Sequence, residues 1–254
     1  MTASSLTLTA LETLPSIAAG DDLAAEILAA AGREGLDFRD GDILVIAQKI
    51  VSKAEGRLVP LSHYGPSDRA HALAGETGKD PRLIEAVLSE SATVLRARPG
   101  VIITEHRLGH IMANAGIDRS NIGGGEDAIL LLPQDPDASA HAVRDRIGAA
   151  TGARIGVIVS DSFGRPWRHG TTGVAIGTAG PAMVIDRRGT PDRDGRALQV
   201  TEIGFADAVA AACVLVMGEG DEGRPAVRAR GLQWAETAGR AADGLRTAGE
   251  DLFR

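Results

Sequence analysis

Apolar and polar positions alternate along this chain in short blocks that set out a series of helices and strands. Six stretches are predicted to be strands, and they lie at 43–47, 101–104, 129–132, 154–159, 181–189 and 224–232. Helical spacing behind capping residues predicts helices over 21–32, after Ser67, after Asp80 and over 137–150. Because these elements follow no regular alternation, the pattern predicts an α+β fold with mixed sheets and helices.

The last third of the chain has a different character. Residues 201–218 form an apolar stretch too long and too rich in alanine for a strand, which predicts a buried helix ending at Gly218. The single cysteine, Cys213, lies inside this stretch, which favours a buried small hydrophobe and excludes a disulfide within one chain. Residues 233–254 are polar and predict a final helix or a pair of turns. No repeat or linker interrupts the chain, so we expect one domain over residues 1–254.

Composition narrows the class of protein. The chain has 254 residues and a net charge of −7, which argues against nonspecific binding to nucleic acid. It has neither a signal-peptide pattern at its start nor an uncharged apolar run long enough for a membrane span, so we expect a cytoplasmic protein. Aromatic residues make up only 3%, so the core has to be built from Ala, Val, Ile and Leu.

The stretch VIVSDSFGRPWRHGTTGVAIG, residues 157–177, carries the strongest signal for chemistry. Asp161 and Ser162 follow an apolar run where the strand is predicted to end. One or two carboxylates and a hydroxyl, completed by phosphates and water, typically hold magnesium-type ions. Arg165 and Arg168 would neutralise phosphate charge. The alternative interpretation is a helix cap or an arginine-bearing turn.

Two further glycine-flanked stretches contain candidate ligands. NAGIDRSNIGGG, residues 114–125, offers Asp118 and Asn121 either as oxygen ligands or as turn anchors. GEGDEG, residues 218–223, matches a dinucleotide fingerprint literally, but it follows a predicted helix and its three acids would repel a pyrophosphate. It therefore favours a cation site that includes Glu219, or a solvated turn at a helix end.

Two other signals are weaker. Lys53 follows a hydroxyl residue just beyond the 43–47 run, where it could serve a phosphate, although lysines on solvated faces are commoner. His106 and His110 have the spacing of zinc ligands on a helix, but glycine-rich surroundings and the lack of a third ligand favour a structural or solvent-facing role.

Several of these stretches together resemble one family. In chain order they are LPSI (14–17), GDILVIAQKIVSKAEGR (41–57), NAGIDRSN (114–121), SDSFGRPWRHGTTGVAIG (160–177) and VMGEGDEGRPAVRARGL (216–232). They resemble the coenzyme F420-0:L-glutamate ligase family, the gamma-glutamyl ligases, from about residue 14 to about residue 235. The chain resembles the stand-alone form of the family, without the nitroreductase-like domain that follows in some members.

The resemblance implies a GTP- and metal-dependent ligase. Such an enzyme adds L-glutamate to the lactyl carboxylate of coenzyme F420-0, releases GDP and phosphate, and in some members repeats the step. The implied ions are Mg²⁺ or Mn²⁺, with K⁺ as a further candidate. The implied structure is an unusual α+β fold in an intertwined homodimer, so the single domain could comprise two intertwined lobes.

Site residues follow from the resemblance position by position. The guanine nucleotide is expected at Leu14, Pro15, Ser16, Ile17, Gln48, Lys53 and Asn121. Asp118 and Asp161 are expected to hold one metal ion and Ser162 a second, with Glu219 as a further ligand suggested by the acidic turn. Gln48 stands where members can have a smaller hydroxyl residue, and Ser162 keeps the hydroxyl of a frequent threonine.

The implied chemistry explains the mixture of acids and arginines. A carboxylate must be phosphorylated before an amine can displace its oxygen, and cations must neutralise the repulsion between the two anions. In this hypothesis Asp161 acts through the metal, while Arg165 and Arg168 face phosphate. Two other functions remain open, a metal-dependent phosphohydrolase and a non-catalytic protein that binds a nucleotide or deazaflavin.

Overall fold

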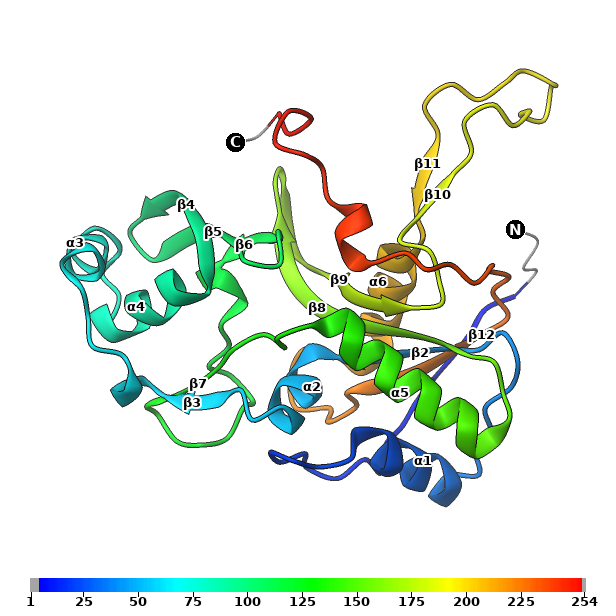
Figure 1. The fold of residues 1–254 in the computed structure, drawn as a ribbon, viewed down its shortest axis with the longest axis horizontal. Coiled ribbons are helices and arrows are strands. Elements are labelled where there is room, and N and C mark those ends of the chain that lie inside the picture. Colours follow the sequence, from blue (N-terminus) through cyan, green and yellow to red (C-terminus); the bar gives the residue numbers. More distant parts are fainter. Residues whose placement is uncertain (1–4, 253–254) are drawn as a thin grey trace.

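A five-stranded mixed sheet forms the centre of the computed structural model, which describes residues 5–252 (Figure 1). Its strand order is β1-β12-β2-β8-β9, and only β2 and β8 run parallel. The strands are β1 (Thr7–Ala10), β12 (Ala226–Arg230), β2 (Ile43–Ala47), β8 (Gly156–Arg165) and β9 (Arg168–Ala179). The chain therefore brings its first and one of its last strands together at one side of the sheet.

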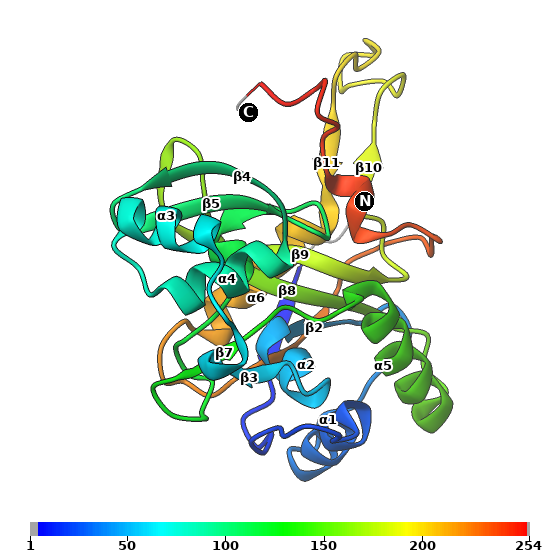
Figure 2. The ribbon, with the colours of Figure 1, turned by 60° about the vertical axis from the view of Figure 1, so that its left-hand side comes forward.

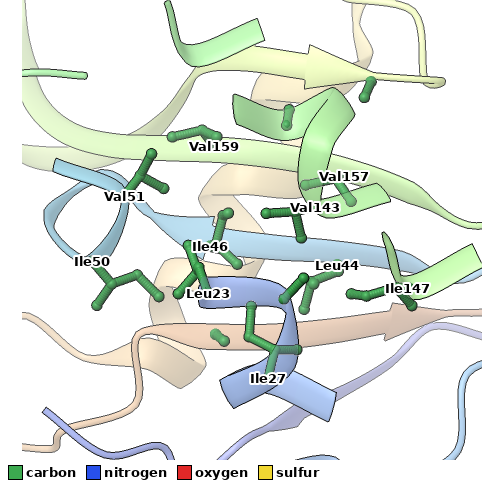
Figure 3. Packing of buried hydrophobic residues seen from close by; sticks show 14 of the residues in the cluster. Leu23, Ile27, Leu44, Ile46, Ile50, Val51, Val143, Ile147, Val157 and Val159 are labelled. Atoms are coloured by element: carbon green, nitrogen blue, oxygen red, sulfur yellow. The ribbon is translucent and has the colours of Figure 1, made fainter. Parts of the chain in front are cut away.

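Helices cover both faces of this sheet. Along β2, Leu44 and Ile46 pack with α1 (Leu23–Arg33), α2 (Gln48–Ala54) and α5 (Pro136–Thr151), as Figure 3 shows. Ile43 and Val45 point to the opposite face, toward α6 (Phe205–Met217). A strand buried on both faces reads as a continuous apolar run, which is why β2 is apolar at every position.

A second, smaller core lies beside the sheet (Figure 2). It packs α3 (Asp68–Thr77) and α4 (Pro81–Glu90) against the antiparallel sheet β4-β5-β6. These strands are Ser91–Arg98, Val101–His106 and Ile111–Ala113. The pair β3 (Leu58–Pro60) and β7 (Ala128–Leu130) joins the two cores, with short 3-10 turns η1 (Leu61–His63) and η2 (Asn114–Gly116).

Two β-hairpins project from the body toward the same side (Figures 1 and 2). One is the outer part of β8 and β9, which turns at residues 165–168. The other is β10 (Val184–Asp186) with β11 (Glu202–Gly204) and the intervening loop. The C-terminal stretch passes between them with a 3-10 turn, η3 (Ala241–Gly244). In the part of the chain described, no helix has the length and apolar character needed to cross a membrane.

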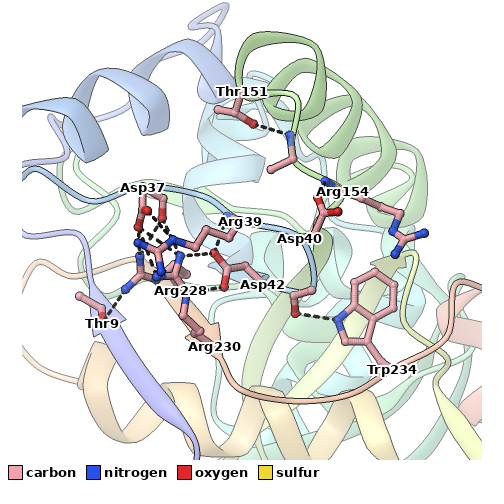
Figure 4. A network of polar contacts seen from close by, with 12 residues as sticks. Thr9, Asp37, Arg39, Asp40, Asp42, Thr151, Arg154, Arg228, Arg230 and Trp234 are labelled. Carbon is pink, nitrogen blue, oxygen red and sulfur yellow. Dashed lines mark hydrogen bonds and ion pairs between the residues drawn. The ribbon is translucent and has the colours of Figure 1, made fainter.

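A polar network fastens β12 to the segment that leads into β2 (Figure 4). Asp42, only 1% exposed, accepts hydrogen bonds from Arg230 through both carboxylate oxygens at 2.7 Å. Arg228 donates to the backbone oxygen of Asp37 at 2.7 Å. Pairing to Asp42 raises the pKa of the Arg230 guanidinium. The buried carboxylate of Asp42 therefore has a positively charged partner.

Most predicted elements are confirmed. The predicted helices correspond to α1, α3, α4, α5 and α6, with Asp22, Ser67, Asp80 and Asp135 as N-caps. The predicted strands correspond to β2, β5, β7, β8, β10 and β12. Cys213 is fully buried, as expected. Residues 233–252 contain turns and η3 rather than an α-helix, while residues 253–254 lie outside the described chain.

One prediction about the strongest motif is wrong. β8 does not end at Asp161 but continues through Ser162 to Arg165, because β9 pairs with it along a long hairpin. The glycines of this motif lie within these two strands. Gly177 sits where the first residue of α5 presses on β9, and a Cβ there would come within 2.4 Å of the Pro136 carbonyl oxygen.

We expect Gly177→Ala to destabilise the protein by ~1–3 kcal/mol, because the added methyl group overpacks the contact between β9 and α5. Gly164 is the matched control, since a Cβ there meets nothing within 4 Å, and Gly164→Ala should change stability by less than ~0.5 kcal/mol. Urea unfolding followed by circular dichroism measures both. Equal stability of the two variants would contradict the close approach.

Candidate active site

Three strand ends, those of β1, β12 and β2, meet beside the middle of β8 at one edge of the central sheet. The register pairs Ala10 with Val227, Ala226 with Ile46 and Ala47 with Ser160. Beyond Ala47 the chain turns into α2, whereas β8 continues with β9 alone. The two parallel strands therefore separate at their carboxyl ends, which is where ligands bind in open sheets with parallel strands.

A cavity of about 340 Å³ lies at this edge. Its lining comes from residues 14–17, 47–50, 53, 121, 160–162, 214, and 217–225 apart from Asp221. Every residue expected to bind the nucleotide is among them, namely Leu14, Pro15, Ser16, Ile17, Gln48, Lys53 and Asn121. The fold thus brings together in one cavity residues as far apart in the sequence as Leu14 and Pro225.

The segment of residues 14–17 is fixed at both of its ends. On one side the Glu34 carboxylate accepts hydrogen bonds from the backbone N–H groups of Glu12 and Thr13 at 2.8 and 2.7 Å. On the other side the Asp21 carboxylate accepts one from the Ala18 N–H at 2.7 Å. This wall of the cavity is therefore held in place before any ligand arrives.

The expected metal ligands also come together. Asp161, Ser162 and Glu219 line the cavity, and the Ser162 hydroxyl donates to Glu219 Oε2 at 3.0 Å. Asp118 lies beside them, where its Oδ2 accepts a hydrogen bond from Gln48 Nε2 at 2.6 Å. Lys49 Nζ stands 3.5 Å from the other oxygen of Asp118.

Loss of water and repulsion from neighbouring carboxylates make the acids of this cluster harder to ionise. Burial, reinforced by the charges of Asp118 and Glu219, raises the pKa of Asp161 to about 7. Burial also raises the pKa of Asp118, against the opposing effect of Lys49 and Gln48. Burial and the nearby Lys49 lower the pKa of Lys53. Groups with displaced pKa values in a cleft are typical of functional sites.

The loop after Asp118 is tied to the cavity from two sides. Lys49 Nζ and Lys53 Nζ donate to the backbone oxygens of Ser120 and Asn121, each at 3.2 Å. Asn121 Nδ2 donates to the Gly220 oxygen at 2.8 Å, which joins the loop to the acidic turn. Lys49 was missed by reasoning from the sequence. Its position one helical turn before Lys53, on the same face of α2, is the signal that could have found it.

The oxygen donors of this cluster fit a divalent ion whose remaining ligands are phosphate oxygens and water. Within residues 5–252, no three His, Cys, Asp or Glu side chains are placed so as to hold an ion by themselves. Magnesium is usually held by one or two carboxylates, with phosphate oxygens and water as the other ligands. Two half-buried carboxylates with raised pKa values, beside a hydroxyl and a third carboxylate, meet that requirement.

The two predicted arginines do not join this cluster within one chain. Arg165 and Arg168 are exposed at the tip of the β8–β9 hairpin and do not line the cavity. His106 ends β5 and His110 lies in the turn before β6, so neither is on a helix, and both are buried. Burial lowers the pKa of His110 to about 4, so it is a neutral core residue, in agreement with the structural role.

The turn at residues 218–223 is also explained. Gly218 caps α6, so the glycine motif follows a helix as predicted, and the dinucleotide interpretation has no strand to build on. Gly218 has a φ of 77°, and a Cβ there would lie 2.1 Å from the Glu222 carboxyl group. The glycine lets the turn fold back tightly enough to bring Glu219 to Ser162.

Lysines, glycine turns and carboxylates around a cavity where two parallel strands separate are typical of an enzyme that acts on a small molecule. The family model for F420-0:gamma-glutamyl ligase matches residues 12–231. The chain belongs to this family, and the prediction of a ligase is confirmed.

Close relatives cover nearly the whole chain. It is 47% identical to the coenzyme F420:L-glutamate ligase of Methanothermobacter thermautotrophicus over 90% of each chain. The enzymes of the same name from Methanopyrus kandleri and Methanocaldococcus jannaschii are 45% and 43% identical, over 92% of each chain and over 85% of this chain and 86% of the relative.

We expect Asp161→Asn to stabilise the metal-free protein at pH 8 by ~1–3 kcal/mol and to have little effect near pH 4. The proton on Asp161 favours the folded state, and this stabilisation is lost as the pH rises from 3.8 through about 7. The amide needs no proton, and its oxygen still accepts the Ser162 N–H. Unfolding in the presence of a chelator measures the effect.

Asp221→Asn is the control for that measurement, because it removes a charge from the exposed turn and not from the cavity lining. Its effect on stability at pH 8 should be much smaller than that of Asp161→Asn. A gain for Asp161→Asn that is the same at both pH values would show that the buried charge is not its cause.

Proposed function

We propose that this protein is a GTP- and divalent-metal-dependent ligase that joins L-glutamate to coenzyme F420-0 through an acyl phosphate, with release of GDP and phosphate. The observation that carries the proposal is the single cavity shared by the expected nucleotide residues and by Asp161, Ser162 and Glu219. The names of its relatives support the acceptor and the amino acid. Mg²⁺ or Mn²⁺ suits the oxygen ligands, and K⁺ remains a further candidate.

The chain's own residues divide the work in this proposal. Asp118 and Asp161 would hold one divalent ion, and Ser162 with Glu219 a second. Bound there, the ions supply positive charge that screens the phosphates from the substrate carboxylate. Lys53 and the wall at residues 14–17 orient the nucleotide so that its γ-phosphoryl group faces that carboxylate. The carboxylate oxygen attacks phosphorus and GDP leaves, and then the glutamate amine attacks the acyl carbon and phosphate leaves.

We also propose a homodimer. Leu215 on α6 is 86% exposed and Trp167 at the hairpin tip is 85% exposed, which is unusual for large apolar side chains. A second copy of the chain packed against these surfaces would cover them. The β8–β9 hairpin, with Arg165 and Arg168, would then contact the other copy. Light scattering after size-exclusion chromatography should give twice the mass of one chain.

The decisive assay combines the protein with F420-0, L-glutamate, GTP and Mn²⁺ or Mg²⁺, and detects products by mass spectrometry. Mass gains of whole glutamyl units that require both GTP and metal are the expected result. Phosphate release without such gains would favour the phosphohydrolase. Nucleotide binding with neither product would favour a non-catalytic binding protein.

Asp161→Ala should lower kcat/KM for ligation by at least ~10²-fold, since the variant lacks a carboxylate that positions the ion. The protein should remain folded, as circular dichroism can verify. Asp221→Ala is the matched control, because it removes a carboxylate outside the cavity lining, and it should keep the activity. Full turnover by the Asp161 variant would refute the assignment.

A further inference from the structure

Lys49 is the cation in the midst of the acidic cluster. Both oxygens of Asp118 are engaged, Oδ2 by Gln48 Nε2 at 2.6 Å and Oδ1 by Lys49 Nζ at 3.5 Å. The same ammonium group opposes the rise in the pKa of both Asp118 and Asp161. It therefore stands near the place that a divalent ion would take between these carboxylates.

We propose that Lys49 is a built-in counter-ion that stands where a divalent ion would bind Asp118 and has to withdraw from Asp118 when the ion binds. The proposal rests on the metal site of the proposed function. It adds that the protein itself competes with the ion, and that this competition ends when an anionic ligand draws the lysine away.

The contacts of Lys49 suit a group that moves. Apart from Asp118, its ammonium nitrogen donates to the neutral backbone oxygen of Ser120 at 3.2 Å. Its side chain is 30% exposed, so solvent can receive the displaced ammonium group. The four-carbon stem of a lysine allows such a swing while α2 stays fixed. An ammonium group and a divalent ion on the same carboxylate would repel each other strongly.

Competition of this kind links the ion to the anion. An anion that pairs with Lys49 removes the competitor from Asp118 and so strengthens metal binding, and by linkage the metal strengthens binding of the anion to the same degree. Lys53 provides a contrast on the same helix. It donates to the Asn121 backbone oxygen at 3.2 Å, and no ion pair joins it to the described carboxylates.

The test measures the binding of Mn²⁺ alone by calorimetry, with the free ion followed by electron paramagnetic resonance. Lys49→Met should bind Mn²⁺ about tenfold more tightly than the unmodified protein. Lys53→Met removes the same charge from the same helix but no ion pair with Asp118, so its gain in Mn²⁺ affinity should be clearly smaller than that of Lys49→Met. Lys49→Arg keeps the charge and should bind Mn²⁺ as weakly as the unmodified protein. Equal or weaker Mn²⁺ binding by Lys49→Met would overturn the proposal.

Two further readouts separate this role from a structural one. In a chelator, Lys49→Met should unfold at a lower temperature than the unmodified protein. Mn²⁺ should restore the lost stability and so remove this difference. A merely structural lysine would give a loss that Mn²⁺ does not restore, which would count against the proposal. GTP should strengthen Mn²⁺ binding to the unmodified protein several-fold and to Lys49→Met much less.

Failure of the counter-ion role can be told apart from failure of the proposed function. If the unmodified protein binds Mn²⁺ and forms the glutamyl product but Lys49→Met gains no affinity, only the counter-ion role is wrong. If neither protein binds Mn²⁺, with or without GTP, the metal site is wrong and both proposals fall.

Discussion

The parallel pairing of β2 with β8 is the constraint on which the site depends. It places Ala47 opposite Ser160, after which β2 leaves the sheet while β8 stays in it, paired with β9. One becomes α2 and carries Gln48, while the other continues as a hairpin strand and carries Asp161. Because both strands are buried on both faces, their register cannot slip without exposing apolar side chains to water or burying polar ones. The separation that opens the cavity is therefore set by the packing of the core.

The polarity of the site follows from that geometry. The carboxylates of Asp118 and Asp161 have lost part of their water, and the charge of Asp118 adds to the cost of ionising Asp161. A folded protein tolerates such a cluster only if a cation or a proton compensates for it. In the ligand-free chain, Lys49 and the raised pKa of Asp161 provide part of this compensation. The energetic cost is confined to this cluster. Asp42 is the opposite case, because both oxygens of its buried carboxylate are paired with Arg230.

Much of the fold could be predicted from the sequence, because apolar periodicity and capping residues are local signals. The helices behind Ser67 and Asp80 illustrate this, since cap and spacing agree in each. The hairpin partner β9 could not be found in this way, because glycines that usually indicate turns serve here for close packing against α5 and α6. The convergence of residues 14–17 with Asn121 and Glu219 depends on contacts between distant segments, and motif order, not periodicity, pointed to it.

The pairing of β1 with β12 has a consequence for synthesis of the chain. Thr7 lies opposite Arg230, and β12 stands between β1 and β2 in the sheet. The N-terminal strand therefore has no neighbour in this sheet until β12 has left the ribosome. Pairings of such large sequence separation form late and slowly. Until then an unpaired strand edge and the apolar side chains beneath it stay exposed, a condition that favours aggregation and recruits chaperones.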